Sequence, residues 1–403
     1  MVKIRHILLI FHLLIVNGFS NETPTILVSF DGMRFDYLEK TNTPHFDSFI
    51  KKGVKAKSLI PVYPSYTFPN HYSIATGTYS GNHYLTGNHY YSKIHKERYT
   101  YYKRETVINP KFYKGEPIRV TAEKQGVKTA SYFWVGSEAP INGHKPSIVK
   151  DYDGKVPFEN RVDSVIAWLK LPEKVRPKLV LCYFSEPDKS GHKHGPDSKK
   201  TIKAIIKSDK MLGRLIKGLE KNDIEANIIL VSDHGMREIS RRRVIVIDDY
   251  ISDMSQVTTY DGGPILQIDS EDKNIYNQLK DIRHLSVYSK ENIPERYHFV
   301  NENTGDFILV PDPGWLVFTQ EEIETTGMLN IKGMHGWDPA DPQMHGIFFA
   351  NGPDIKKGIE IDSFENVYVY GLISSLINIK PYSRAEFPDG AIINRDLIQR
   401  VRK

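Results

Sequence analysis

The chain has 403 residues, of which 40% are hydrophobic and 26% charged, with a net charge of +5. This composition is typical of a folded globular protein and excludes an intrinsically disordered or fibrous one. The length allows one large domain or two ordinary ones, each with a substantial core. The charges are mixed, without the dense basic tract of a nucleic-acid-binding arm, so we expect no specific nucleic-acid partner.

Residues 1–20 differ from the rest of the chain. Lys3 and Arg5 precede an apolar run at 7–16, and small residues follow it. This pattern predicts a signal peptide, with 21–403 as the mature, secreted or periplasmic protein. The run is about half of the roughly 20 residues that a membrane span needs, and an uncleaved anchor is the alternative. We expect no membrane span later in the chain, and the sequence leaves the oligomeric state open.

Cys182 is the single cysteine, which excludes an intrachain disulfide. It lies inside the apolar run 179–184. We therefore expect an inert, buried thiol rather than a reactive one.

Short apolar runs that end in polar residues recur along the chain. Such runs are typical of strands buried on both faces of a parallel sheet, and amphipathic helical patterns lie between them. The alternation predicts an α/β fold with a central, mostly parallel sheet flanked by helices. The runs cover residues 25–30, 179–184, 227–232 and 345–350, and the helical patterns cover 161–169, 202–219 and 367–379.

Two stretches interrupt this alternation. Residues 84–114 are rich in tyrosine and lysine, and residues 257–317 mix short β-like pieces with turns. We interpret both as cap-like insertions beside the sheet of a single catalytic domain, 21–403.

Acidic and histidine residues follow the predicted strands, where ligands bind in α/β sheets. Alone, Asp31 would be interpreted as a cap of the turn after its strand. Carboxylates and imidazoles without thiolates, however, are a ligand set that suits zinc or a similar divalent ion. Six such residues are too many for one tetrahedral catalytic site and about right for two. They are Asp31, Asp188, His192, Asp233, His234 and His335.

Thr67 is the candidate nucleophile. The segment 64–72 turns into a helical pattern, which places Thr67 at a helix start. There, backbone N–H groups and the positive end of the helix dipole favour a phosphate. A threonine at this position could equally be a plain N-cap. A nearby metal would lower the pKa of its hydroxyl and make it a nucleophile.

Five segments, in this order over nearly the whole mature chain, carry a family resemblance. They are Ser29-Phe30-Asp31-Gly32, Thr67-Phe68-Pro69-Asn70-His71-Tyr72, Glu186-Pro187-Asp188 with Gly191-His192, Ser232-Asp233-His234-Gly235-Met236 and Gly333-Met334-His335-Gly336. Together they resemble the nucleotide pyrophosphatase/phosphodiesterase family (ectonucleotide type) of the alkaline phosphatase superfamily. The resemblance implies an alkaline-phosphatase-like fold and two Zn²⁺ per chain.

The resemblance also implies residue roles. One zinc would be held by Asp188, His192 and His335, and the other by Asp31, Asp233 and His234, with the Thr67 hydroxyl bound to the second. Thr67 would attack phosphorus to give a covalent phosphothreonine, which water then cleaves. Asn88, with the Thr67 N–H, would donate to a non-bridging oxygen. Asn88 could also be an ordinary turn residue, since Tyr84 stands where the family often has glycine. His345 falls outside the motif and is interpreted as a structural strand residue.

Three aromatic residues bear on the substrate. Phe68, Trp134 and Tyr152 match positions where nucleotide-cleaving members of the family stack the base. Packing beneath the loop is the alternative, above all for Trp134. Much of the stretch 136–155 is missing in the family's lysophospholipid-cleaving branch, and here it is present. The resemblance therefore implies nucleotide or dinucleotide substrates, with nucleoside monophosphates as products. The alternatives are a choline-phospholipid or glycerophosphodiester phosphodiesterase and an inactive nucleotide-binding protein.

Overall fold

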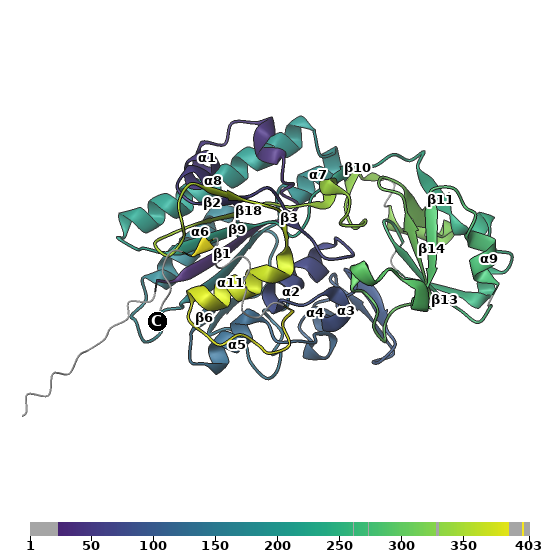
Figure 1. The fold of residues 1–403 in the computed structure, drawn as a ribbon, viewed down its shortest axis with the longest axis horizontal. Helices are drawn as coiled ribbons and strands as arrows, with labels where there is room; N and C mark the ends of the chain where they lie inside the picture. The colour runs from purple at the N-terminus through teal and green to yellow at the C-terminus, as the bar shows by residue number, and fades with distance from the viewer. Residues whose placement is uncertain (1–22, 261, 273, 328–329, 387–396, 399–403) are drawn as a thin grey trace, which may run out of the picture.

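The computed structural model describes residues 23–260, 262–272, 274–327, 330–386 and 397–398. In this part of the chain an eight-stranded sheet crosses the molecule in the order β19-β2-β18-β9-β1-β8-β6-β7 (Figure 1). Only β18 runs antiparallel to its neighbours, which confirms the predicted α/β architecture with a mostly parallel sheet. The strands are β1 (Thr25–Phe30), β2 (Val54–Ala56), β6 (Thr129–Tyr132), β7 (Ile148–Lys150), β8 (Leu179–Phe184), β9 (Asn227–Val231), β18 (Phe348–Asn351) and β19 (Ile359–Ile361).

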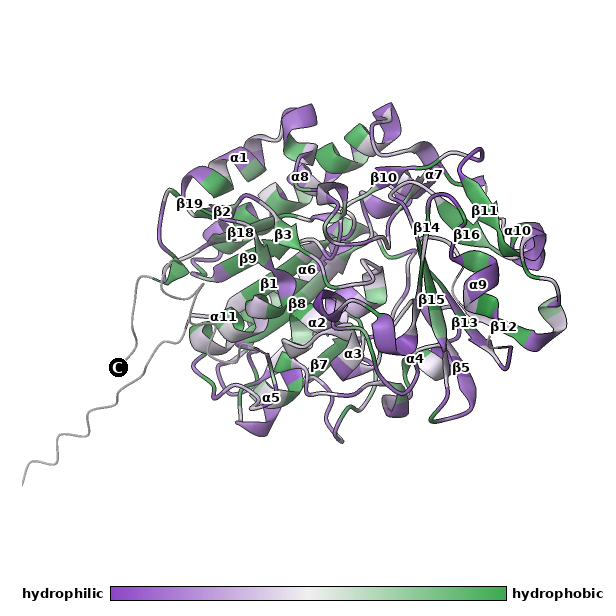
Figure 2. Cartoon of the chain, turned by 45° about the vertical axis from the view of Figure 1, so that its right-hand side comes forward, coloured by the Kyte–Doolittle hydropathy of each residue, from purple (hydrophilic) through white to green (hydrophobic). Residues whose placement is uncertain are grey.

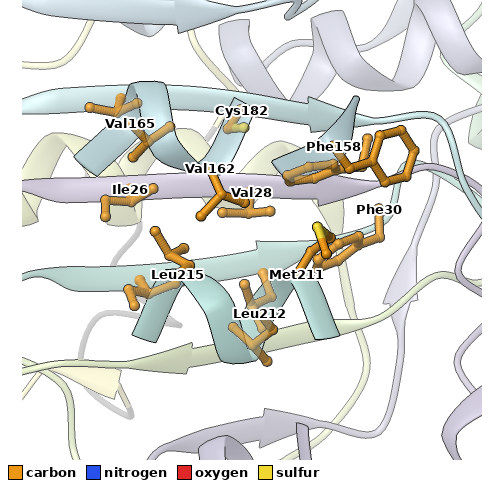
Figure 3. Close-up of a cluster of buried hydrophobic side chains, with 14 of the residues drawn as sticks. Ile26, Val28, Phe30, Phe158, Val162, Val165, Cys182, Met211, Leu212 and Leu215 are labelled. Carbon is orange, nitrogen blue, oxygen red and sulfur yellow. The ribbon is translucent and has the colours of Figure 1, made fainter. Parts of the chain in front are cut away.

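Helices cover both faces of this sheet because successive side chains of each central strand point to opposite sides. On β1, Ile26, Val28 and Phe30 pack with helices α1, α6 and α8, as Figure 3 shows for α6 and α8. Leu27 faces the other side, toward α2, α5 and α11. The predicted helices at 161–169 and 202–219 fall within α6 and α8. The bounds are α1 (Pro44–Lys51), α2 (Thr67–Thr76), α5 (Ile118–Lys124), α6 (Phe158–Leu169), α8 (Lys199–Lys221) and α11 (Val369–Leu376).

Cys182 is buried in the same apolar cluster (Figure 3), and burial raises the pKa of its thiol to about 12. The expected buried thiol is confirmed. His345 precedes β18 instead of lying in it, contrary to the sequence interpretation. The reason is that both ring nitrogens bond loop groups, Nδ1 with Ser58 Oγ and Nε2 with the Pro339 carbonyl, each at 2.8 Å.

A second lobe, at the right of Figure 1, contains an antiparallel sheet in the order β12-β13-β15-β14. The β4–β5 hairpin of the segment 84–114 lies against it. Tyr91 stacks on Tyr260 at 5.6 Å between ring centroids, and Lys93 Nζ donates to Asp269 Oδ1 at 2.6 Å. The two predicted insertions thus touch, while their role as caps stays a prediction. The strands are β4 (His89–Ser92), β5 (Glu97–Thr100), β12 (Val257–Tyr260), β13 (Leu266–Ser270), β14 (Leu285–Ser289) and β15 (Phe307–Pro311).

Hydropathy follows this architecture. In Figure 2 the strands of the central sheet are predominantly hydrophobic, whereas the outer helices turn hydrophilic faces outward. Among the described residues, no helix has both the length and the apolar composition that crossing a membrane requires. The predicted signal segment 1–20 lies outside the described residues.

Candidate metal centre and active site

Three aspartates meet at one edge of the central sheet because β8, β1 and β9 are adjacent and parallel. Asp31 follows β1, and its N–H donates to the carbonyl of Phe184, the last residue of β8 (2.9 Å). The Asp188 N–H donates to the Asp31 carbonyl (3.0 Å), and the Gly32 N–H to Asp233 Oδ1 (3.2 Å). These bonds fix all three carboxylates at the carboxyl ends of the strands.

Gly32 permits this close approach. Its φ is +65°, a conformation that side chains disfavour. A Cβ added there would lie 2.8 Å from the Cβ of Asp188. Any other residue would therefore push the Asp188 carboxylate away from Asp31.

Three histidines complete the cluster, each with one ring nitrogen committed to the backbone. The Nδ1–H groups of His192, His234 and His335 donate to the carbonyls of Gly333, Gly235 and Ser65, all at 2.8 Å. This leaves the Nε2 lone pair of each ring as the ligand atom. His192 comes from α7 (Asp188–His194), and His335 follows β17 (Gly333–Met334), which pairs with β10 (Arg237–Glu238).

The ligand atoms form two adjoining groups. In the first, Asp188 Oδ1 lies 3.3 Å from His192 Nε2 and 3.6 Å from His335 Nε2, and the two nitrogens are 3.1 Å apart. In the second, His234 Nε2 lies 3.3 Å from Asp31 Oδ1 and 3.0 Å from Asp233 Oδ2. Tetrahedral zinc ligands at 2.0–2.1 Å from the ion are about 3.3 Å apart, so both groups have suitable spacing. His234 is also close enough to share an ion with Asp188 and His335.

The three aspartates give the cluster a negative charge that bound cations would offset. Asp31 Oδ1, Asp188 Oδ1 and Asp233 Oδ2 are buried and accept no hydrogen bond within the described part of the chain. Burial, with repulsion from Asp233 and Asp188, raises the pKa of Asp31 well above its usual value. Burial opposes ionisation of Asp188 too, but His192 and His335 outweigh it and lower that pKa to about 2. Buried carboxylate oxygens that accept no hydrogen bond are costly, and divalent ions would neutralise their charge.

Thr67 lies beside the second group. It is the first residue of α2, as the sequence predicted, and its side chain is half-buried. Its Oγ1 is 3.1 Å from His234 Nε2. The hydroxyl therefore lies at the rim of the cluster formed by Asp31, Asp233 and His234.

Two further residues, which the sequence interpretation missed, support this cluster. His71 places Nδ1 2.9 Å from the Thr67 carbonyl and 3.2 Å from Asp233 Oδ2, and its Nε2 is 2.8 Å from Ser29 Oγ. The Tyr183 hydroxyl donates to Asp31 Oδ2. The helical spacing of four between Thr67 and His71 could have revealed the first. Tyr183 stands in an apolar strand, and nothing in the sequence marks its hydroxyl.

The remaining predicted residues lie around Thr67 at different depths. Asn88 Oδ1 accepts the Phe68 N–H (2.9 Å), which turns the Asn88 amide Nδ2 away from that bond. Phe68 is half-buried and packs against Tyr101 with ring centroids 5.5 Å apart. Tyr152 is 48% exposed, and its N–H donates to Glu138 Oε1 (3.0 Å).

Trp134 lies in the core, unlike the other two aromatic residues. Its side chain is 2% exposed, and its indole N–H donates to the His71 carbonyl (3.0 Å). Ring burial of this degree leaves no open face for a base. This burial fits the alternative in which Trp134 packs beneath the loop, and its hydrogen bond holds the His71 backbone in position.

The fold agrees with what comparison with known proteins shows. The family described as Type I phosphodiesterase / nucleotide pyrophosphatase matches residues 25–338, and the chain belongs to this family. Its alkaline-phosphatase-like fold also has solved counterparts. Murine ectonucleotide pyrophosphatase/phosphodiesterase 5 is 32% identical, with a TM-score of 0.85 over 93% of this chain and 100% of that one. An inactive threonine-to-alanine variant of that mouse protein, in complex with AMP, gives a TM-score of 0.86, with 32% identity over 94% of this chain and 100% of that one.

Curated relatives show the same affiliation. Human ectonucleotide pyrophosphatase/phosphodiesterase family member 1 is 38% identical over 89% of this chain and 40% of its own length. A venom phosphodiesterase from Crotalus durissus collilineatus is 36% identical over 90% of this chain and 45% of its own length. The chain thus spans less than half the length of these curated relatives.

Proposed function

We propose that this chain is an exported two-zinc enzyme that hydrolyses nucleotide phosphodiester or pyrophosphate bonds through a covalent phosphothreonine, releasing nucleoside monophosphates. The observation that carries the proposal is the position of Thr67 Oγ1, 3.1 Å from a histidine of two adjoining carboxylate–imidazole groups. Family membership supports it.

Each of the two carboxylate–imidazole groups would hold one metal ion. Asp188, His192 and His335 would hold one ion, and Asp31, Asp233 and His234 the other. Ions bound there would lower the pKa of a hydroxyl or a water and offset charge on the transferred group. His71 and Tyr183 act on the carboxylates Asp233 and Asp31 as positioning residues.

Thr67 supplies the nucleophile. Its Oγ1 forms a bond to phosphorus as the bond to the leaving-group oxygen breaks, and the hydroxyl proton passes to solvent. The Asn88 Nδ2 and the Thr67 N–H donate to the non-bridging oxygen that gains charge. Water then attacks the phosphothreonine, which releases the nucleoside monophosphate and restores the hydroxyl. The start of α2 favours the phosphate throughout.

Aromatic side chains favour a nucleotide as substrate. Phe68 adjoins Thr67, and Tyr152 offers an exposed ring, so the two rings could hold a base by stacking. The AMP bound to the mouse relative is a ligand of the same class.

A chromogenic nucleotide monophosphate ester tests the chemistry. We expect chelator-sensitive hydrolysis by the wild type and a fall in kcat of about a thousandfold or more in Thr67→Ala. Thr258→Ala, at an exposed threonine of the second lobe, is the matched control. Elemental analysis should give two zinc ions per chain in all three proteins. Undiminished hydrolysis by Thr67→Ala would refute the mechanism, and one ion or none would refute the two-zinc site.

Export has its own test. The proposal rests on the charged, apolar and small-residue pattern of residues 1–20. Expression of the full chain in a secretion-competent host, with N-terminal sequencing of the product outside the cytoplasm, should give a start near residue 21. Retention inside the cell with an intact N-terminus would contradict it.

A further inference from the structure

Helix α8 presents an almost purely cationic face to solvent. Nine of its 23 residues are exposed, and eight of these are lysine or arginine; the ninth is Glu220, near the C-terminal end. Seven of the cations recur at alternating intervals of three and four residues, which places them on one side of the helix. We call these seven the cationic stripe: Lys200, Lys203, Lys207, Lys210, Arg214, Lys217 and Lys221.

The charge of the stripe is largely uncompensated. Within the described residues, Arg214 is its only member in an ion pair, with Asp163 Oδ2 at 2.8 Å. Asp209, on the inner side of the helix, is buried and accepts the backbone N–H groups of His45 and Phe46. Like charges three or four residues apart repel each other and destabilise a helix. A polyanion bound along the stripe would offset that repulsion.

The stripe is long and narrow. At 1.5 Å per residue it spans about 30 Å from Lys200 to Lys221, with one cation about every 5 Å. Helices α1 and α6 both contact α8 in the outer layer of the molecule (Figure 1). Their exposed faces differ from the stripe, because α6 exposes Asp163 and α1 exposes Asp47 beside Lys51. The uniformly cationic surface is therefore only one helix wide.

The composition of this face indicates what kind of polyanion it fits. None of the exposed residues of α8 is aromatic, whereas proteins bind single-stranded nucleic acid by stacking its bases on aromatic rings. None is apolar, whereas surface helices that bind membranes insert an apolar face. A flat membrane would also meet the aspartates of α1 and α6. A narrow, straight row of lysines instead matches one flexible chain that carries sulfate groups along its length.

We propose that the cationic stripe of α8 binds a linear sulfated polysaccharide of the heparin class. Sulfate groups would pair with the lysine ammonium groups, and release of the counterions around the polyanion would drive binding. Helix α8 runs from α7, at the carboxyl end of β8, back toward the start of β9, so it leads away from the metal-ligand cluster. Binding there would hold the protein on a polysaccharide while leaving the cluster open. The inference is thus independent of the proposed function.

Three variants of the full chain test it, with heparin as the probe. The stripe variant replaces three lysines by glutamine, which is also a strong helix former: Lys203→Gln, Lys210→Gln and Lys217→Gln. The arginine variant keeps the charge at the same three positions. The control variant makes the same change of net charge at three exposed lysines outside α8: Lys128→Gln, Lys145→Gln and Lys150→Gln.

Calorimetry at physiological salt gives the affinities. We expect the stripe variant to bind heparin at least about tenfold more weakly than wild type, and the control variant to remain within about twofold. The arginine variant should bind at least as tightly as wild type. The wild-type affinity should fall steeply with salt, and the slope of log K against log[salt] should lose about two to three units in the stripe variant. Hydrolysis of the chromogenic ester should be the same in all four proteins.

Loss of affinity confined to the stripe variant, with no binding of desulfated heparin, would support the proposal. Equal losses in the stripe and control variants would overturn it, because net charge alone would then explain binding. An unchanged affinity in the stripe variant, or a wild-type salt slope below about two units, would overturn it as well. Wild-type binding of a single-stranded oligonucleotide, or of vesicles rich in phosphatidylserine, as tight as that of heparin would overturn the choice of a sulfated polysaccharide.

Discussion

Replacing Asn88 by alanine separates its two possible roles, oxyanion donor and turn residue. Its Oδ1 accepts the Phe68 N–H at 2.9 Å, and none of the described residues accepts a hydrogen bond from its Nδ2. As a donor to the transferred phosphoryl group, Nδ2 is worth about 10²–10³ in kcat. As a turn residue, Asn88 contributes one backbone hydrogen bond, about 1 kcal/mol of stability. We expect Asn88→Ala to show both losses, with the larger in kcat.

Sulfur substitution distinguishes the roles directly. Sulfur is a poor hydrogen-bond acceptor, so a phosphorothioate with sulfur at the oxygen that the proposed mechanism assigns to Asn88 should be cleaved slowly by the wild type. Asn88→Ala should then cleave the oxo and thio substrates with more similar rates, because the lost donor no longer discriminates between them. Chemical denaturation of the same variant measures the stability loss. A kcat within about twofold of wild type, or an unchanged thio effect with lowered kcat, would assign Asn88 to the turn alone.

Three further predictions follow from buried contacts. Tyr183→Phe removes the hydrogen bond to Asp31 Oδ2 and should weaken binding of the proposed zinc by about tenfold in a chelator competition; unchanged affinity would contradict a positioning role. Trp134→Phe loses the indole bond to the His71 carbonyl and should lower stability by about 1–3 kcal/mol, without altering the ratio of KM values for purine and pyrimidine substrates; a changed ratio would restore the stacking role. Burial lowers the pKa of His83 to about 3, below its unfolded value near 6.5, so its stabilising contribution is complete above pH 6.5 and is lost as the pH falls toward 3. Between pH 7.5 and 5.5 this loss is about 1.4 kcal/mol in the free energy of unfolding, and His83→Gln should lack it; equal pH dependence in both proteins would disprove the assignment.

The hydrophobic pattern predicted the central strands well, because a strand that is buried on both faces consists of a continuous apolar run. The run before Asn351 shows the limit of this reasoning. It was expected as another strand of the parallel sheet, but β18 pairs antiparallel with β9 and β2. An apolar run records how deeply a strand is buried and not which way its neighbours run. Direction depends on the connections between strands, which local sequence does not encode.

The same distinction explains which site residues could be foreseen. Aspartates and histidines at strand ends are easy to recognise in the sequence because they directly follow apolar runs. The parallel sheet then brings Asp31, Asp188 and Asp233 together. Tyr183 and Trp134 also carry a hydrogen-bond donor, but both lie in apolar surroundings. Each takes its positioning role from a hydrogen-bond acceptor that is distant in the sequence. For Tyr183 that partner is a carboxylate 152 positions earlier in the chain, and for Trp134 it is a backbone carbonyl 63 positions earlier. A hydrogen bond of that span forms only once the sheet has folded. Local sequence therefore does not predict that Tyr183 and Trp134 support the metal-ligand cluster.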